Sequence, residues 1–548
     1  MGLKRRLTLL LSLVTGLALF LAACSGGDQT SSDDSKGSGK KEKDTEQVLI
    51  YARGGDSSSL DFASVSDGET SRVTKNIYES LLDYDRESFE IVPKLAKEWE
   101  VSEDGLTYTF FLEEGVKFHD GSDFNAEAVK INFERWSDPE HQYSFTDDGY
   151  IYPLYGAMFG GYKGEEGHII KEVNVKGDYE IEFVLNEPLG SFLQNMAMHY
   201  FSITSPAALE EHGSKINENP VGTGPFKFAS WTKDDQIVLE KNEDYWKEGL
   251  PKLDRVIYKV IPDTAARLIA LKSGEVDIID DVNPEDAEGI EADENLQLFT
   301  RSENNVGYLG FNNQKEPLNN KQVRQAINYA IDKQSIIDAL YSGYATPAKN
   351  LIPPTYLGYN DEVAGYDYDP EKAKELLEKA GYKDGFDIDL WVMPVSRPYM
   401  PDPEKVSEII QNNLGQVGIK VNIVREEWAP YLEKTAKGDQ ELYLMGWSGT
   451  NGDPNYFFDS LMHSKAIGGE NRNFYENKEV DKLLDQARLS IEQDERAKLY
   501  KEAQVLLSED APTALLVHSK PLVAAKSTVK NFIPHPSTSD PLEEVELE

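Results

Sequence analysis

Alternating apolar and polar positions predict several short β-strands along the chain. Ile181, Phe183 and Leu185 alternate with polar residues, as expected of a strand with one buried face. The same period of two recurs at Val256, Tyr258 and Val260. Other strands are expected at residues 48–52, 108–112, 386–390, 419–424 and 442–447.

Apolar residues spaced three and four apart predict helices between these strands. Val323, Ala326 and Ile327 fall on one helical face. Asp369 followed by Pro370 is typical of a helix start. Strands and helices mixed in this order predict an α/β fold, and 548 residues are too many for one compact core. Further helices are expected at residues 126–136, 403–415 and 481–507.

Residues 1–23 have the organisation of a secretory signal peptide. Basic residues at positions 4–6 precede an uncharged, leucine-rich run that ends in small residues. The final LAAC resembles the bacterial lipobox, which predicts that Cys24 is lipidated and becomes the new N-terminus. A plain membrane-spanning anchor is the alternative, but the run is at the short limit for a span. Residues 24–46 therefore predict a lipid-anchored cysteine and a flexible tether rich in Ser, Gly, Asp and Lys.

The formal net charge of −41 argues against binding to nucleic acid, because such a surface repels phosphate backbones. Cys24 is the only cysteine in the chain, so no internal disulfide is expected.

No catalytic motif in the sequence is complete. None of the eight histidines belongs to a His-Glu-x-x-His array, which gives no support to a zinc hydrolase. Thr450 replaces the last glycine of a nucleophile elbow at residues 446–450. Lys227 replaces the third glycine of a dinucleotide site that begins at Gly222. We therefore expect a protein that is not an enzyme and that uses no cofactor or metal ion.

From Val48 onward the sequence resembles the family-5 extracellular solute-binding proteins of peptide and nickel ABC importers, and the dipeptide-binding proteins are the most similar. The resemblance rests on motifs in family order: LAKEWEVSEDG (95–105), GVKFHDG (115–121), NPVGTGPF (219–226), LWVMPVSRPY (390–399) and MGWSGTNGDP (445–454).

The resemblance implies a two-lobed α/β fold of the periplasmic-binding-protein type that closes about a hinge. Residues 47–303 and 525–548 are expected to form the first lobe, with an inserted subdomain at about 79–225. Residues 304–524 are expected to form the second lobe, so the chain crosses near 303 and 525.

The resemblance also implies a function. The expected protein is a monomeric lipoprotein on the outer face of the cytoplasmic membrane, in a Gram-positive cell. It captures di- or oligopeptides between the lobes and delivers them to the permease and ATPase subunits of an ABC importer.

Arg397 is the residue that the resemblance matches to the partner of the peptide carboxylate. An arginine fork suits that role because it donates two parallel hydrogen bonds. The relatives place an aspartate for the peptide ammonium where this chain has Thr450. Asp453, Asp67 and Glu69 are the alternative carboxylates, and Ser66 lies in the same loop as Asp67.

Aromatic side chains and a glycine-rich loop are expected to complete the site. Trp447, Trp428 and Tyr399 are predicted walls of the side-chain pockets, and Gly449 and Asn451 are predicted to bind the peptide main chain. The threonine at position 450 leaves longer peptides open as ligands. Glutathione, a nickel chelate, haem and an oligosaccharide also remain open, as does a role in sensing peptides at the cell surface.

Overall fold

The computed structural model describes residues 46–548. The expected signal peptide, the lipidation of Cys24 and nearly all of the expected tether lie outside the described residues. Within 46–548, no helix is both long enough and apolar enough to cross a bilayer.

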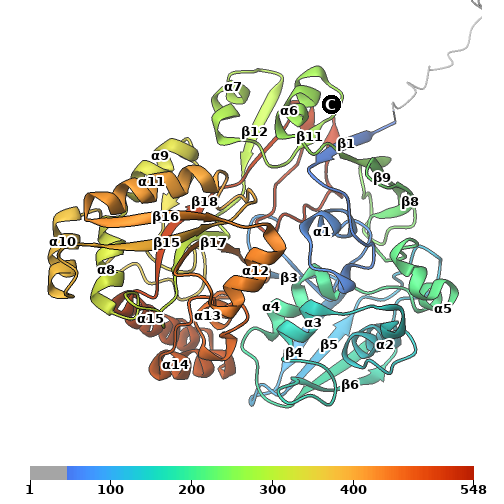
Figure 1. The fold of residues 1–548 in the computed structure, drawn as a ribbon. Helices are drawn as coiled ribbons and strands as arrows, with labels where there is room; N and C mark the ends of the chain where they lie inside the picture. Colours follow the sequence, from blue (N-terminus) through green and yellow to red (C-terminus); the bar gives the residue numbers. More distant parts are fainter. Residues whose placement is uncertain (1–45) are drawn as a thin grey trace, which may run out of the picture. The chain divides into compact units, whose positions relative to one another are not determined.

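A seven-stranded sheet gathers strands from both ends of the described chain (Figure 1). β1 lies at its centre, parallel to β10 on one side and to β11 on the other, and antiparallel pairs complete the sheet. The strands in sheet order are β12 (Leu296–Thr300), β19 (Leu522–Lys526), β11 (Ile278–Ile279), β1 (Val48–Arg53), β10 (Arg255–Val260), β9 (Gln236–Lys241) and β8 (Phe226–Thr232).

A six-stranded sheet forms the centre of the second lobe. All residues of β13 are buried, as expected of a strand covered on both faces, and antiparallel β17 and β18 flank it. Figure 1 shows β15 and β16 side by side, with α11 along them. The order is β14 (Ala345–Pro347), β18 (Thr513–Ser519), β13 (Asn305–Phe311), β17 (Leu442–Ser448), β15 (Phe386–Val392) and β16 (Ile419–Arg425). The helices of this lobe begin with α8 (Lys321–Ala330), α9 (Lys333–Leu340), α10 (Pro370–Lys379) and α11 (Pro403–Gln416).

An antiparallel four-stranded sheet lies within the range expected for the insertion, residues 79–225. Its aromatic core includes Phe183, whose ring centroid lies 4.8 Å from that of Phe133 and 5.7 Å from that of Phe110. Phe133 belongs to α2 (Ala126–Ser137), so this helix packs on the sheet. The strands are β4 (Ala96–Val101), β5 (Thr107–Leu112), β7 (Glu180–Leu185) and β6 (Ile170–Gly177).

Shorter elements connect these three sheets. The helices are α1 (Gly68–Thr74), α3 (Pro153–Met158), α4 (Phe192–Ala197), α5 (Pro206–His212), α6 (Thr264–Ser273), α7 (Ala287–Glu291), α12 (Trp428–Lys437) and α13 (Asn455–Leu461). Two small antiparallel pairs join β2 (Leu82–Tyr84) to β3 (Ile91–Pro93) and β20 (Val529–Lys530) to β21 (Glu546–Leu547).

The chain passes twice between the seven-stranded and six-stranded sheets. Residues 301–304 separate β12 from β13, and residues 520–521 separate β18 from β19. The expected second boundary at residues 524–525 falls inside β19, which already pairs with β12. The second crossing therefore lies a few residues earlier than the sequence motifs indicate.

The expected single helix over residues 481–507 is wrong, because the structure has two. α14 (Lys478–Leu489) ends at Ser490, whose backbone is extended, and α15 (Gln493–Asp510) follows. At the break, the Ser490 hydroxyl accepts a hydrogen bond from the Glu492 amide at 3.3 Å. The amide of Gly190 donates to the Arg488 carbonyl at 2.8 Å, so another part of the chain satisfies the helix end.

A buried ion network holds the first crossing. The guanidinium of Arg301 donates to both oxygens of Asp540, at 2.5 and 2.8 Å, and to the carbonyl of His535 at 2.8 Å. Asp280 lies 3.4 Å from the same guanidinium and also binds Arg72 of α1. The network thus joins the first crossing, helix α1 and the C-terminal segment.

Removing Arg301 is expected to destabilise the protein strongly. Arg301→Gln leaves Asp540 buried without its cation, a change that costs about 3–5 kcal/mol in comparable pairs. Thermal unfolding followed by circular dichroism measures the effect. Lys420→Gln is the control, because Lys420 pairs with Asp387 on the surface and such pairs contribute about 1 kcal/mol or less. Equal melting temperatures for the two variants would contradict the role of the network.

Candidate ligand-binding site

Arg397 lies in the loop that follows β15, with its side chain exposed. Its guanidinium carbon is 5.6 Å from the ring centroid of Trp428, the first residue of α12. Its guanidinium donates from Nη1 to the Ser396 carbonyl at 3.0 Å. No carboxylate of residues 46–548 forms an ion pair with it. Arg397 is therefore free to bind an anion while Trp428 supports its planar face.

Tyr399 fixes the Arg397 loop against β17. The hydroxyl of Tyr341 donates to the Tyr399 carbonyl at 2.8 Å, and the Tyr399 ring packs over Gly446. A Cβ atom at Gly446 would lie 2.2 Å from that ring, so only glycine leaves room for the contact. This packing brings the Arg397 loop next to Trp447, the residue after Gly446.

The end of β17 carries polar atoms that the protein leaves without partners. Trp447 Nε1 and Thr450 Oγ1 are buried and have no hydrogen-bond partner in the described part of the chain. The ring of Tyr456 lies 5.1 Å from that of Trp447 and closes one side of the site. Because an unsatisfied buried polar group is costly, a ligand that bonds to these atoms would recover free energy.

Gly449 is held by the first crossing. Its amide donates to the Asn304 carbonyl at 2.8 Å, and its carbonyl accepts from Asn304 Nδ2 at 2.8 Å. A Cβ atom there would lie 1.9 Å from the hydroxyl of Tyr356. The expected main-chain contact between Gly449 and a peptide is not favoured, because its N–H is already used. The glycine instead joins the loop that follows β17 to residues 301–304, the first crossing between the lobes. We call residues 449–454 the ligand loop and residues 301–304 the hinge segment.

The first lobe faces this loop across a cavity of about 180 Å³. Ser71 of α1 and Tyr200 line it together with Gly449 and Thr450. Burial raises the pKa of Tyr200 above its ordinary value, with smaller contributions from the nearby charge of Asp67. Residues from both lobes thus surround one space.

Asp67, the residue before α1, forms no ion pair with any cation of residues 46–548. It caps α1 by accepting from the Thr70 amide at 2.8 Å, and it accepts from the Ser58 hydroxyl at 2.6 Å. Neither donor carries a charge, so the negative charge of Asp67 is available to a cation. The predicted neighbour Ser66 is exposed immediately before it.

Glu69 and Asp453 already have cationic partners. Glu69 pairs with Arg72 at 2.7 Å. Asp453 pairs with Arg496 at 2.7 Å, and both side chains are fully buried. An ammonium group would have to compete with an arginine for either carboxylate. The structure therefore favours Asp67 among the three predicted partners of the peptide amine.

Asn451 connects distant parts of the chain. Its Nδ2 donates to Asn195 Oδ1 of α4 at 2.9 Å, and its Oδ1 accepts from the Asp453 amide at 3.0 Å. Arg496 also donates to the carbonyl of Gly190, at 3.1 Å. Asn451 and the partner of Asp453 thus bind the loop after β17 to residues 190–195.

Sequence reasoning missed Tyr456, Tyr200 and Ser71. Each lies outside the motifs used to locate the site, and Tyr456 and Tyr200 are two of 28 tyrosines. Only long-range packing brings them to the cleft.

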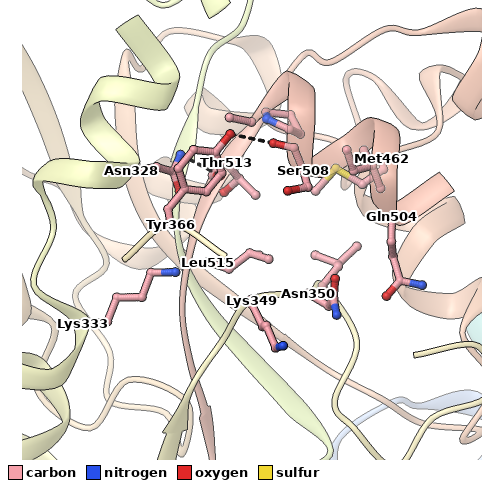
Figure 2. A pocket seen from close by; sticks show the side chains of 14 residues that line it. Asn328, Lys333, Lys349, Asn350, Tyr366, Met462, Gln504, Ser508, Thr513 and Leu515 are labelled. Carbon is pink, nitrogen blue, oxygen red and sulfur yellow. Dashed lines mark hydrogen bonds between the residues drawn. The ribbon is translucent and has the colours of Figure 1, made fainter. Parts of the chain in front are cut away.

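A second cavity lies within the second lobe, between α8, α15 and β18 (Figure 2). Its volume of about 40 Å³ has room for only one or two water molecules. Lys333 lines it and donates to the Ala348 carbonyl at 2.9 Å, and burial lowers the pKa of this lysine to about 8. The cavity is too small for a peptide. No group of three or more potential metal ligands occurs in residues 46–548.

Residues 90–469 match the model of the bacterial extracellular solute-binding proteins, family 5 Middle. The chain belongs to this family. The haem-binding protein A of Haemophilus influenzae is 37% identical, over 97% of each chain. The dipeptide-binding protein of Escherichia coli is 36% identical, over 92% of this chain and 95% of its own.

A solved structure supports the same assignment. The family-5 chain shares 36% identity and a TM-score of 0.78 with the periplasmic binding protein DppA from Helicobacter pylori in complex with the peptide STSA, covering 91% of this chain and 98% of that one. The two-lobed α/β fold predicted from the motifs is confirmed.

Asp453→Asn tests whether this carboxylate stabilises the fold through its ion pair with Arg496. The substitution leaves Arg496 buried without a negative partner, so the free energy of unfolding is expected to fall by about 3–5 kcal/mol. Thermal or urea unfolding measures the change. Asp387→Asn, at an exposed ion pair, is expected to be nearly neutral. A stable Asp453→Asn protein would show that the carboxylate is free for ligand.

Proposed function

We propose that this family-5 protein is the peptide-binding subunit of an ABC importer. The observation that carries the proposal is the pair of unpaired charges that the fold presents: Arg397 on the second lobe and Asp67 on the first. A free peptide is a zwitterion, so a receptor that reads its two ends needs one group of each sign. Relatives named for dipeptides, and a structural relative in complex with the peptide STSA, support the same ligand class.

In the proposed complex, Arg397 binds the peptide carboxylate. Its exposed guanidinium donates two parallel hydrogen bonds, and Trp428 holds the planar group from one face. Trp447 and Tyr456 form an aromatic wall for side chains, with no charge to select among them. The buried Trp447 Nε1 and Thr450 Oγ1 donate to peptide carbonyl groups and gain the partners they lack.

Asp67 takes the peptide ammonium in place of the aspartate that this chain lacks at position 450. The amine then contacts the first lobe and the carboxylate contacts the second, so one ligand links both. Such bridging stabilises the closed arrangement by the ligand's own binding energy.

The remaining parts of the proposal concern the cell. Cys24 anchors the protein by lipid on the outer face of the cytoplasmic membrane, and the segment up to residue 46 tethers the binding body. A monomer delivers the peptide to the permease and its ATPases, and no chemical step takes place on the protein.

A second ligand class is haem, because the relative named haem-binding protein A is 37% identical along almost the whole chain. The same Arg397 and aromatic wall would then hold an acidic, planar molecule.

Native mass spectrometry of the purified protein, with extraction of what it carries, separates these candidates. Short peptides are expected in the extract. Haem in the extract, or an empty protein that does not bind added peptides, would contradict the peptide proposal.

Arg397→Gln is expected to weaken dipeptide binding by about 10- to 100-fold, the loss of hydrogen bonds to a charged group. Titration calorimetry measures it. Arg425→Gln is the control, because Arg425 is an exposed arginine at the end of β16, the strand beside β15. Equal affinity of both variants would exclude Arg397 from the site.

Asp67→Asn is expected to weaken dipeptide binding by about 10-fold or more, because the substitution removes the charge that faces the ammonium. Asparagine caps a helix as well as aspartate, so α1 and the melting temperature should be unchanged. Asp369→Asn, at the cap of α10, controls for the exchange itself. If binding is retained in Asp67→Asn, the amine has another partner.

A further inference from the structure

The cavity between Thr450 and the first lobe is lined by more residues than the proposed peptide contacts. Its lining includes Ser71, Tyr200 and Thr450 and also Lys75, Lys94 and Lys247. We call the part lined by the three lysines the lysine cavity. At about 180 Å³ the whole cavity is smaller than sites that enclose a complete ligand, which are roughly 300–1,000 Å³. Its size suits one end or one side chain of a larger ligand.

The carboxylates that line the lysine cavity are all paired. Asp83 lies 2.5 Å from Lys75 and 3.7 Å from Lys94. Glu543 lies 3.4 Å from Lys94, and Glu544 pairs with Arg86. None of these acids is left to attract a cationic ligand.

Lys247 is different, because its ammonium forms no ion pair with any carboxylate of residues 46–548. It lies 5.1 Å from the ring centroid of Trp246, whose indole N–H is fixed by Glu79 at 2.9 Å. Burial, and next the charge of Lys94, lower the pKa of Lys247. The charges of Glu79 and Glu543 act in the opposite direction, but both carboxylates are also bound to Lys94. An anion placed beside Lys247 would add a direct partner for its ammonium group.

The two histidines of the lining add no charge near neutral pH. Burial lowers the pKa of His199 to about 3 and that of His535 to about 4. Both rings are also bound within the protein, His199 to the Thr74 hydroxyl at 2.7 Å and His535 to the Ser88 carbonyl at 2.9 Å. The cationic groups of the lining are therefore Arg86 and the three lysines, and of these Lys247 alone has no carboxylate partner in residues 46–548.

We propose that the lysine cavity is a subsite for a carboxylate on the ligand, with Lys247 as its partner. The proposal rests on the proposed peptide function, and it adds a preference for peptides with an acidic side chain that reaches past Thr450. The buried hydroxyl of Thr450 belongs to the lining and brings no charge that would repel this group. An aspartate at the same position would place a negative charge there.

Calorimetric titration with tripeptides tests the subsite. The probes are Ala-Ala-Ala and peptides with Glu or Gln at each of the three positions. For at least one position, the Glu peptide should bind about tenfold more tightly than its Gln counterpart, as expected for a hydrogen bond to a charged partner. Lys247→Met should abolish that ratio while Ala-Ala-Ala affinity stays unchanged, and Lys247→Arg should keep it.

Lys233→Met is the matched control, because Lys233 also lies over a tryptophan ring, at 2.9 Å, but outside the cavity lining. Ratios near one at all positions, or a ratio that survives Lys247→Met, overturn the subsite while Ala-Ala-Ala binding still supports peptide capture. Failure of every tripeptide to bind overturns the proposed function and the subsite with it. Melting temperatures of all variants exclude misfolding as the cause.

Discussion

The arrangement of the site depends on the ion pairs that the buried Arg301 forms with Asp540 and Asp280. Arg301 occupies the point where the chain leaves the first sheet, and its hydrogen bonds tie that point to the C-terminal segment through Asp540. Through Asp280 the same network reaches Arg72 and so α1, whose cap is Asp67. Three residues further, Asn304 holds Gly449 of the ligand loop. One hinge segment thus positions the contacts of both lobes.

The end of β17 and the loop after it contain two kinds of residue. Trp447 and Thr450 have buried polar atoms without a partner among the described residues. Gly449, Asn451 and Asp453 bind protein groups on the hinge, on the subdomain and on Arg496. Ligand contact and lobe docking are therefore coupled within a few residues, so a ligand that moves this loop acts directly on the contact between lobes.

Local patterns placed individual strands and helix starts, but they did not predict contacts between distant parts of the chain. The apolar period placed β15 and β16, and the Asp-Pro pair placed the start of α10, because these signals depend only on neighbours in sequence. The break between α14 and α15 was missed, since the amide of Gly190 that satisfies it is far away in the chain. The pairing of Asp453 with Arg496 could not be predicted for the same reason, because it is visible only in the folded protein.

Some side chains of the ligand loop are bonded to the protein and others are not, and this difference affects which positions can change in evolution. A side chain that is bonded to the protein cannot change without a loss of stability, whereas one whose polar atom has no protein partner can. Thr450 is of the second kind among the described residues of this loop, because its hydroxyl is unbonded. Position 450 is thus where a substitution can change the ligand specificity with the smallest loss of stability.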